Sequence, residues 1–182
     1  MIAVSGGSTA PELFDALVRH DVPWDRTTVW QVDERIAPDG DVARNAGQLD
    51  TLPVRVRPMP VTASDLRAAA RRYAATLPAR FDVVHLGLGD DGHTASWPPH
   101  DPVVDSTRDC EVVDEFNGYR RMTLTPRVVN AARSRMVLTL GSSKAGMVER
   151  WMLRDPELPI DRVRRSATWV FLDPPAAAGL PS

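Results

Sequence analysis

A histidine that could act as a general base lies in a turn of glycines and aspartates. His93 sits within residues 89–96, which read Gly-Asp-Asp-Gly-His-Thr-Ala-Ser. A neighbouring aspartate could orient its imidazole ring and raise its basicity, as a general base requires. The alternative is a surface or capping histidine, which is the commoner role of an isolated one. The candidate pocket residues contributed by this turn are Gly89, Asp91, Gly92, Thr94 and Ser96.

The run Ser5-Gly6-Gly7-Ser8-Thr9 could bind a phosphate. Its two glycines allow a tight turn and a close approach of the backbone to a ligand. A helix is expected to follow, and the start of a helix presents free N–H groups and a partial positive charge. The hydroxyls of Ser8 and Thr9 could add donors. The alternative is a plain turn with Thr9 as the helix cap, and the glycine spacing and missing lysine exclude a P-loop.

Charged residues supply further candidates for the chemistry. Asp33 and Arg35 flank a glutamate after an apolar run. Arg35 could bind a carboxylate or phosphate through its forked guanidinium, and Asp33 could position a hydroxyl or a cation. Arg121 and Lys144 are two more possible anion ligands. Each of these residues could instead be an ordinary solvated surface charge.

Residues 87–92 formally match the G-x-G-x-x-G pattern of dinucleotide-binding proteins, but we reject that interpretation. Asp90 and Asp91 would place negative charge beside a pyrophosphate. Pro98 and Pro99 would cut the following helix short, and the motif lies in mid-chain rather than in an opening βαβ unit. No set of histidine, cysteine and acidic residues shows the spacing of a metal site. We therefore expect neither an organic cofactor nor a metal.

An alternation of strands and helices has to position these candidates. Short apolar runs without strict alternation are typical of strands buried on both faces, and they occur at residues 2–4, 28–32, 81–88, 136–140 and 168–172. Helices are expected from Thr9, whose spacing to Glu12 resembles a capping box, over residues 63–77, from Thr125 and over residues 143–153. Two short strands, 111–116 and 121–124, should form an added edge or a hairpin. The pattern predicts an open, mostly parallel α/β sheet with helices on both faces, a Rossmann-like three-layer arrangement.

Four of the expected strands run directly into polar segments. These segments are residues 5–9, 33–35, 89–96 and 141–144. In open α/β sheets, ligands bind in the crevice beyond the carboxyl ends of the strands. One such cluster could arise by chance, but four predict a shared binding site.

Composition and charge narrow the class of protein. The 182 residues, 43% hydrophobic and 25% charged, suit one globular domain, expected over residues 1–173 with a flexible tail over residues 174–182. The net charge of −2 does not indicate a nucleic-acid binder or a polybasic membrane binder. Cys110 is the only cysteine, and no apolar run approaches the length of a membrane span. We expect a cytoplasmic protein, and leave open whether it is a monomer or a homodimer.

At these residues the sequence resembles the 6-phosphogluconolactonase family, within the larger group that includes glucosamine-6-phosphate deaminases. The resemblance covers about residues 2–173, with the motifs in the same order. The D-G-H-T-A-S segment at residues 91–96 is its most specific part. The matching segments are residues 5–9, residues 33–35 with the later Asn45, and residues 87–96, 121–125, 141–144 and 169–173.

The resemblance implies a NagB/RpiA-like fold and the hydrolysis of 6-phosphogluconolactone to 6-phosphogluconate in the pentose phosphate pathway. It further implies that residues 5–9 hold the phosphate of this sugar-phosphate substrate, with help from Arg121 and Lys144. His93 would activate the water that attacks the lactone carbonyl. Arg35 or Lys144 would stabilise the developing oxyanion, and Asp33 would orient the substrate or His93.

The sequence departs from the family pattern in two places. Members usually carry a helix and a strand ahead of the phosphate loop, whereas Met1 stands almost on it. We expect either a start farther upstream or an N-terminally short form, which would lack a helix over one sheet face and expose apolar surface. The family usually continues after Ser96 with Leu-Phe-Pro. Here Trp97-Pro98-Pro99 follows, and Trp97 is expected to line the mouth of the pocket.

Two other functions remain open at this point. Amino-sugar-phosphate isomerases and deaminases usually follow the histidine with I-A-F-N-E-P, so the T-A-S at residues 94–96 favours a lactonase. A non-catalytic sugar-phosphate-binding protein would bind the same ligands tightly without turning them over.

Overall fold

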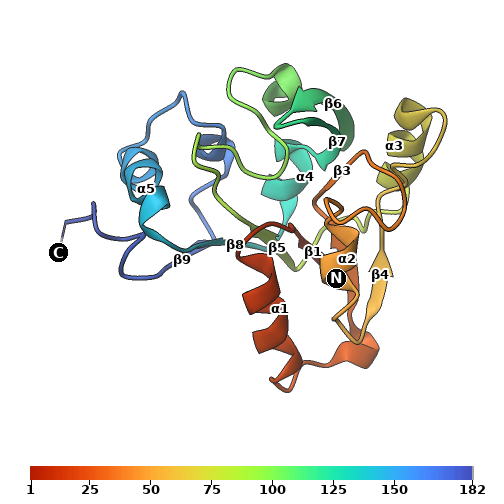
Figure 1. Ribbon diagram of the computed structural model, residues 1–182, viewed down its shortest axis with the longest axis horizontal. Coiled ribbons are helices and arrows are strands. Elements are labelled where there is room, and N and C mark those ends of the chain that lie inside the picture. The colour runs from red at the N-terminus through yellow and green to blue at the C-terminus, as the bar shows by residue number, and fades with distance from the viewer. Residues whose placement is uncertain (182) are drawn as a thin grey trace.

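The computed structural model describes residues 1–181, whose strands form a six-stranded sheet with helices packed on both faces (Figure 1). Every neighbouring pair of strands in this sheet is parallel. The strand order is β4 (Arg55–Arg57), β2 (Thr28–Gln31), β1 (Ile2–Val4), β5 (Val83–Leu86), β8 (Ser134–Thr139) and β9 (Thr168–Leu172). The expectation of an open parallel α/β sheet is confirmed.

The order of the strands changes direction between β1 and β5. From β1 the chain builds outward through β2 to β4, then returns to the other side of β1 and builds through β5, β8 and β9. Val4 of β1 pairs with Gln31 on one side and with His85 on the other. The loops after β1 and β5 therefore leave neighbouring strands for opposite sides, which opens a crevice where ligands bind in sheets of this kind.

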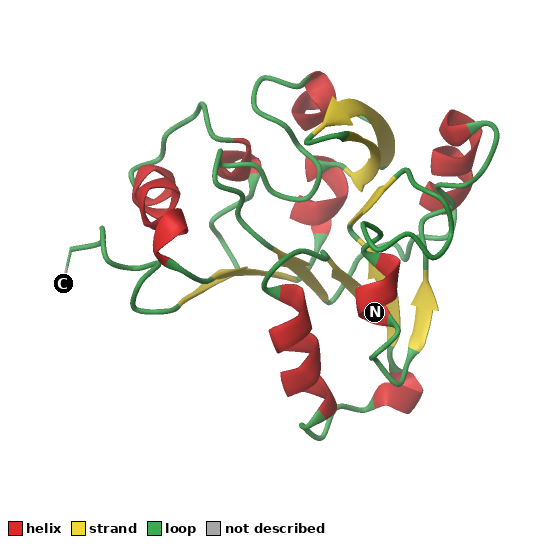
Figure 2. Ribbon diagram, viewed as in Figure 1, coloured by secondary structure: helices red, strands yellow, loops and turns green. Residues whose placement is uncertain are grey.

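Helices lie on both faces of the sheet (Figure 2). On one face lie α1 (Ala10–Val18) and α2 (Ala46–Leu49). On the other lie α3 (Leu66–Ala74), α4 (Pro126–Ala131) and α5 (Ala145–Met152). Four short 3₁₀ helices are also described: η1 (Trp24–Arg26), η2 (Pro102–Asp105), η3 (Ser142–Lys144) and η4 (Pro159–Arg162).

Buried apolar side chains join these layers. On the α1 face, Phe14 of α1 packs with Val4 and Val29 of the sheet. The cluster on the other face is larger and includes the fully buried Trp97 and Trp151. Each large apolar side chain contributes roughly 1.5–3 kcal/mol when it is fully buried. The sheet is therefore a rigid platform for the loops at its carboxyl edge.

A second, antiparallel sheet lies above the main one. It consists of β3 (Asp33–Arg35), β7 (Tyr119–Leu124) and β6 (Cys110–Phe116), in that order. The predicted hairpin is present in β6 and β7, and it does not extend the edge of the main sheet. We did not predict β3 or β4, because β3 consists only of charged residues and β4 is a short run between two arginines.

Two local expectations are wrong. Thr9 precedes α1, but its φ of −90° and ψ of −16° are helical and its side chain makes no capping hydrogen bond. A capping side chain needs an extended backbone to reach back to the helix, so the capping box is absent. Trp97 does not line the pocket mouth. It is fully buried, and its indole N–H donates to the Leu124 carbonyl at 2.8 Å.

The segment after residue 173 packs against the domain. Ala176 is fully buried, its N–H donates to Oδ1 of Asp173 at 2.9 Å, and Leu180 contacts the larger cluster. The flexibility expected for residues 174–182 and the domain boundary at residue 173 stay predictions. Ser182 lies outside the described residues.

Apolar surface is exposed on the edge strand β9. Trp169 and Phe171 alternate along this strand and are 66% and 50% exposed. Their partners across β8 are Met136 and Leu138, so the four side chains share one face of the sheet. In the described part of the chain, no helix is both long and apolar enough to cross a membrane.

Candidate active site

An open pocket of about 180 Å³ lies beyond the carboxyl ends of β1, β5 and β8. It is at the reversal of strand order, where an open α/β sheet binds its ligands. The structure brings together here the four polar segments identified in the sequence. The lining comprises residues 5–9, Asp33, Arg35, Asn45, residues 87–89 and 93–95, Arg121, residues 138–140 and Lys144.

His93 and Asp91 form a close pair at the edge of this pocket. Nδ1 of His93 lies 2.5 Å from Oδ1 of Asp91, and the same oxygen accepts the His93 backbone N–H at 3.1 Å. Partial burial alone would raise the pKa of Asp91, but its hydrogen bonds to His93 and the charge of that ring outweigh this and lower it. With the carboxylate accepting from Nδ1, the His93 tautomer assigned from these contacts leaves the Nε2 lone pair free for a proton.

The turn that carries this pair depends on a glycine. A Cβ atom on Gly89 would lie 2.0 Å from Nδ1 of His93 and 2.8 Å from Oδ1 of Asp91. The Gly89 N–H donates to the His93 carbonyl at 2.8 Å and closes the turn. Only a residue without a side chain fits here, so the ring can lie directly against the backbone.

Three of the predicted pocket residues lie behind the lining. Asp91 contacts His93 but does not line the pocket. Gly92, at φ +83°, lies against Leu158. Ser96 is fully buried and its hydroxyl donates to Oδ2 of Asp33 at 2.7 Å. Thr94 lines the pocket, and its hydroxyl donates to the Gly87 carbonyl at 2.8 Å.

Asp33 brings a buried carboxylate to the pocket. Burial raises its pKa, while the hydrogen bond from Ser96 and the charge of Arg121 partly offset the effect. The Arg121 side chain is only 5% exposed, and burial lowers its pKa. Its Nε donates to the Phe116 carbonyl at 3.0 Å, and its guanidinium lies 5.3 Å from the centre of the Phe116 ring.

Lys144 reaches the pocket from η3, after β8. Its Nζ lies 2.6 Å from Oδ1 of Asp90, a residue of the His93 turn. The hydrogen bond from this ammonium lowers the pKa of Asp90. Because Asp90 is largely exposed, this ion pair is an exchangeable contact that an anionic ligand can replace.

The predicted phosphate loop forms the wall beside α1. Gly7 has a φ of +114°, which the absence of a side chain permits. Its N–H donates to Oε1 of Gln48 at 3.0 Å, so this donor is already partnered. The Ser5 hydroxyl is buried and has no partner among the described residues. The hydroxyls and the backbone N–H groups of Gly6, Ser8 and Thr9 are therefore the available donors of this loop.

The comparisons with known proteins agree with this geometry. A family model described as glucosamine-6-phosphate isomerases/6-phosphogluconolactonase matches residues 1–172. The chain belongs to this family.

Individual members of the family are similar over most of the chain. A 6-phosphogluconolactonase from Synechocystis is 38% identical over 162 residues, which are 79% of this chain and 67% of the relative. The crystal structure of a 6-phosphogluconolactonase from Shewanella baltica is 26% identical with a TM-score of 0.84, covering 94% of this chain and 82% of that one. A monomeric glucosamine-6-phosphate deaminase superposes with a TM-score of 0.85 over 98% of this chain and 87% of its own. At 18% identity, that likeness shows the fold alone.

Two residues at the candidate site of this chain were not predicted from the sequence. Phe116 meets the His93 ring edge-on, with ring centres 5.0 Å apart, and also lies beneath Arg121. Gln48 supports the phosphate loop through Gly7. Neither residue belongs to a motif, so only their position in space reveals them. Within residues 1–181, no group of three or more histidine, cysteine and acidic side chains is placed to hold a metal ion.

Proposed function

We propose that this protein hydrolyses 6-phosphogluconolactone to 6-phosphogluconate, a step of the pentose phosphate pathway. The observation that carries the proposal is the His93–Asp91 pair, which faces a pocket lined by three basic side chains. Relatives at least 30% identical over most of the chain bear the name of this enzyme. The pocket thus combines a base with positive charge for a phosphorylated, ester-like substrate.

The proposed reaction uses His93 as base and then as acid. Nε2 of His93 takes a proton from water, whose oxygen forms a bond to the lactone carbonyl carbon. The carbonyl π electrons move onto oxygen, and Arg35 or Lys144 stabilises this oxyanion. When the oxyanion collapses, the bond from carbon to the ring oxygen breaks and the ring oxygen takes the proton from His93. The new carboxylic acid ionises, so one proton is released per turnover.

Each pocket element has a proposed role in this reaction. Asp91 holds the His93 tautomer, and Asp33 orients the substrate. The loop of residues 5–9 binds the phosphate with Arg121 and Lys144. A base of this kind is typically worth about 10²–10⁴ in rate, and a positioned oxyanion donor about 10²–10³. A lactone is an activated ester, so a general base and an oxyanion donor can hydrolyse it without a covalent intermediate on the protein.

One set of assays distinguishes a lactonase from a deaminase and from a non-catalytic binding protein. Proton release from fresh 6-phosphogluconolactone is followed above spontaneous hydrolysis, and ammonia release from glucosamine 6-phosphate is followed with the same preparation. Fast proton release without ammonia supports the lactonase. Ammonia release would identify a deaminase instead, and binding of 6-phosphogluconate without either turnover would identify a non-catalytic binding protein.

We also propose that the protein works in the cytoplasm on a soluble sugar phosphate. Its one cysteine, Cys110, is free and buried, as suits a reducing compartment. Burial raises the pKa of this thiol to about 12, which keeps it protonated and unreactive.

A further inference from the structure

We propose that Asn45 is a positioning residue for Arg35, and that it joins this arginine to the phosphate loop. This inference rests on the proposed function and adds to it a residue that need not touch the substrate. Asn45 is 3% exposed and lies where the loop between β3 and α2 returns to the pocket.

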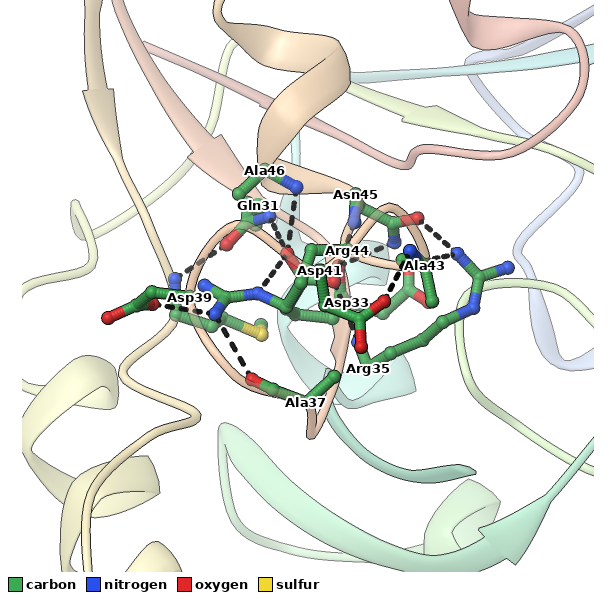
Figure 3. Close-up of polar contacts among 12 residues, drawn as sticks. Gln31, Asp33, Arg35, Ala37, Asp39, Asp41, Ala43, Arg44, Asn45 and Ala46 are labelled. Carbon is green, nitrogen blue, oxygen red and sulfur yellow. Dashed lines mark hydrogen bonds and ion pairs between the residues drawn. The ribbon is translucent and has the colours of Figure 1, made fainter. Parts of the chain in front are cut away.

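Both the oxygen and the nitrogen of the Asn45 side-chain amide hydrogen-bond to residues of β3. Its Oδ1 accepts from Nη1 of Arg35 at 3.0 Å, and its Nδ2 donates to the Asp33 carbonyl at 3.0 Å. The same Nη1 donates to the Ala43 carbonyl at 2.6 Å. Figure 3 shows Arg35 with one terminal nitrogen joined to Asn45 and Ala43, while the other carries no such contact. One half of the guanidinium is therefore fixed, and the other half is available to the pocket.

Asn45 is itself held by a buried carboxylate. Glu34 is fully buried, and its Oε1 accepts the backbone N–H groups of Arg35 and Asn45, each at 2.7 Å. Its Oε2 accepts from Ala46 N–H at 2.8 Å and from Gln31 Nε2 at 2.7 Å. The same Oε2 also pairs with Nε of Arg44 at 3.3 Å. A carboxylate with these five partners holds its neighbours rigidly, because moving any of them leaves a buried charge short of partners. The backbone on both sides of the Arg35–Asn45 contact is thereby fixed.

The third contact of Asn45 is with the phosphate loop. A Cβ atom on Gly6 would lie 2.4 Å from Cγ and Oδ1 of Asn45, so the side chain lies flat against this glycine. The side-chain amide of Asn45 therefore contacts both Arg35 and the phosphate loop and sets their relative position. Within the described residues, Arg35 forms no ion pair, which leaves its charge free for an anionic ligand.

A double-mutant cycle tests whether Asn45 acts through Arg35. Asn45→Ala is expected to lower kcat/KM by roughly 10–100-fold, the scale of a reacting group displaced by about 1 Å. The loss should fall on the same parameter, kcat or KM, that Arg35→Ala changes. Combined with Arg35→Ala, the Asn45 substitution should add little, because coupled residues are not additive. Equal losses with and without Arg35, or wild-type kinetics of Asn45→Ala, would overturn the proposal.

A second variant and a binding measurement keep this test decisive if Asn45→Ala does not fold or the wild type shows no turnover. Should Asn45→Ala not fold, Asn45→Ser removes both amide contacts but leaves a hydroxyl that can hydrogen-bond to water, and it enters the same cycle. The affinity for 6-phosphogluconate, measured by chemical-shift titration, completes the cycle without any turnover. A wild type that lacks lactonase activity therefore defeats the proposed function alone, and the coupling of Asn45 and Arg35 is still decided by binding.

Asp39→Ala is the matched control. Asp39 belongs to the same loop, where it is 82% exposed and pairs with Nη1 of Arg44 at 2.8 Å. Arg44 itself is 8% exposed, and its Nε also pairs with Oε2 of Glu34 at 3.3 Å. Because this contact keeps Arg44 in place when the exposed Asp39 carboxylate is removed, kinetics close to wild type are expected. A loss as large as that of Asn45→Ala would show that any disturbance of the loop impairs the site, which contradicts a specific role for Asn45.

Discussion

Arg35 and Arg121 lie directly opposite each other on the antiparallel strands β3 and β7. Both side chains line the pocket, so two positive charges share one face at its wall. Like charges directly opposite in a sheet are destabilising, and the proximity of Arg35 contributes to lowering the pKa of Arg121 after the larger effect of burial. An anion bound between the two guanidinium groups would relieve this repulsion, so the pair favours an anionic ligand over a neutral one.

Anion binding should therefore stabilise the protein through this pair. At a concentration of about 100 times its Kd, 6-phosphogluconate should add about 2.7 kcal/mol to the free energy of unfolding. Arg121→Gln should lose most of that gain, because one of the two opposed charges is missing. Thermal unfolding with and without ligand measures both. The same ligand-induced rise in Tm for the variant and wild type would contradict an anion site at Arg121.

Asp91→Asn should lower kcat by about 10²-fold or more, the range seen when the orienting acid of a histidine is lost. An amide can present its N–H to Nδ1 of His93 and so favour the tautomer with the proton on Nε2, which cannot act as base. KM should change little, since Asp91 lies behind the pocket lining. Steady-state kinetics decide the point. An unchanged kcat would mean that His93 does not need this partner.

Gly89→Ala should displace the His93 ring, because the new methyl group would lie 2.0 Å from Nδ1. A loss of about 10²-fold in kcat is expected from such a displacement. Gly146→Ala in α5 is the matched control, because its Cβ meets open space and alanine is favoured over glycine by about 1 kcal/mol in a helix. If Gly89→Ala keeps its activity, the turn does not hold the histidine as described.

Asp33→Asn should stabilise the protein while it impairs activity. Burial raises the pKa of Asp33 above its ordinary value of 3.8, so its ionisation costs folding free energy. That cost is absent below pH 3.8, grows as the pH rises to the raised folded pKa, and is complete above it. The asparagine variant should therefore gain stability over wild type at neutral pH and lose this advantage towards pH 3.8. A gain of 1 kcal/mol corresponds to about 2–4 °C in Tm for a domain of this size.

Thermal unfolding of the Asp33→Asn variant and wild type across this pH range provides the measurement. The difference in Tm must shrink as the pH falls. A variant that is less stable than wild type at neutral pH would show that the ionised carboxylate is held favourably by Ser96 and Arg121. Asp33 would then be a structural anchor rather than a strained group in the pocket.

The main sheet, apart from its edge strand β4, and its loops could be predicted because each signal is local. Ile2–Val4 and Thr168–Leu172 are strands with the bounds expected from their apolar runs. The glycines and polar residues that follow β1, β5 and β8 indicated where the crevice lies, since parallel strands present their carboxyl ends at one edge. The His93 turn contained its own partner two residues away, which is why Asp91 could be anticipated.

The rest of the site depends on contacts between distant segments. β3 is a strand only because it pairs with β7, and nothing in the charged triplet Asp33-Glu34-Arg35 favours a strand. Thr9 matched the capping pattern, yet the tight turn through Gly7 places it in a helical conformation that prevents a cap. Phe116 joins His93 and Arg121 through the fold of a hairpin, for which no spacing in the sequence gives a signal.

The central claim is that His93 is the base of a lactonase. The most direct test follows proton release from freshly generated 6-phosphogluconolactone with wild type and His93→Ala side by side, after subtraction of spontaneous hydrolysis. The account predicts fast release by wild type and a fall of about 10²–10⁴ in the variant, with 6-phosphogluconate still bound by both. A folded wild type that never exceeds the spontaneous rate, or a His93→Ala variant as fast as wild type, would contradict it.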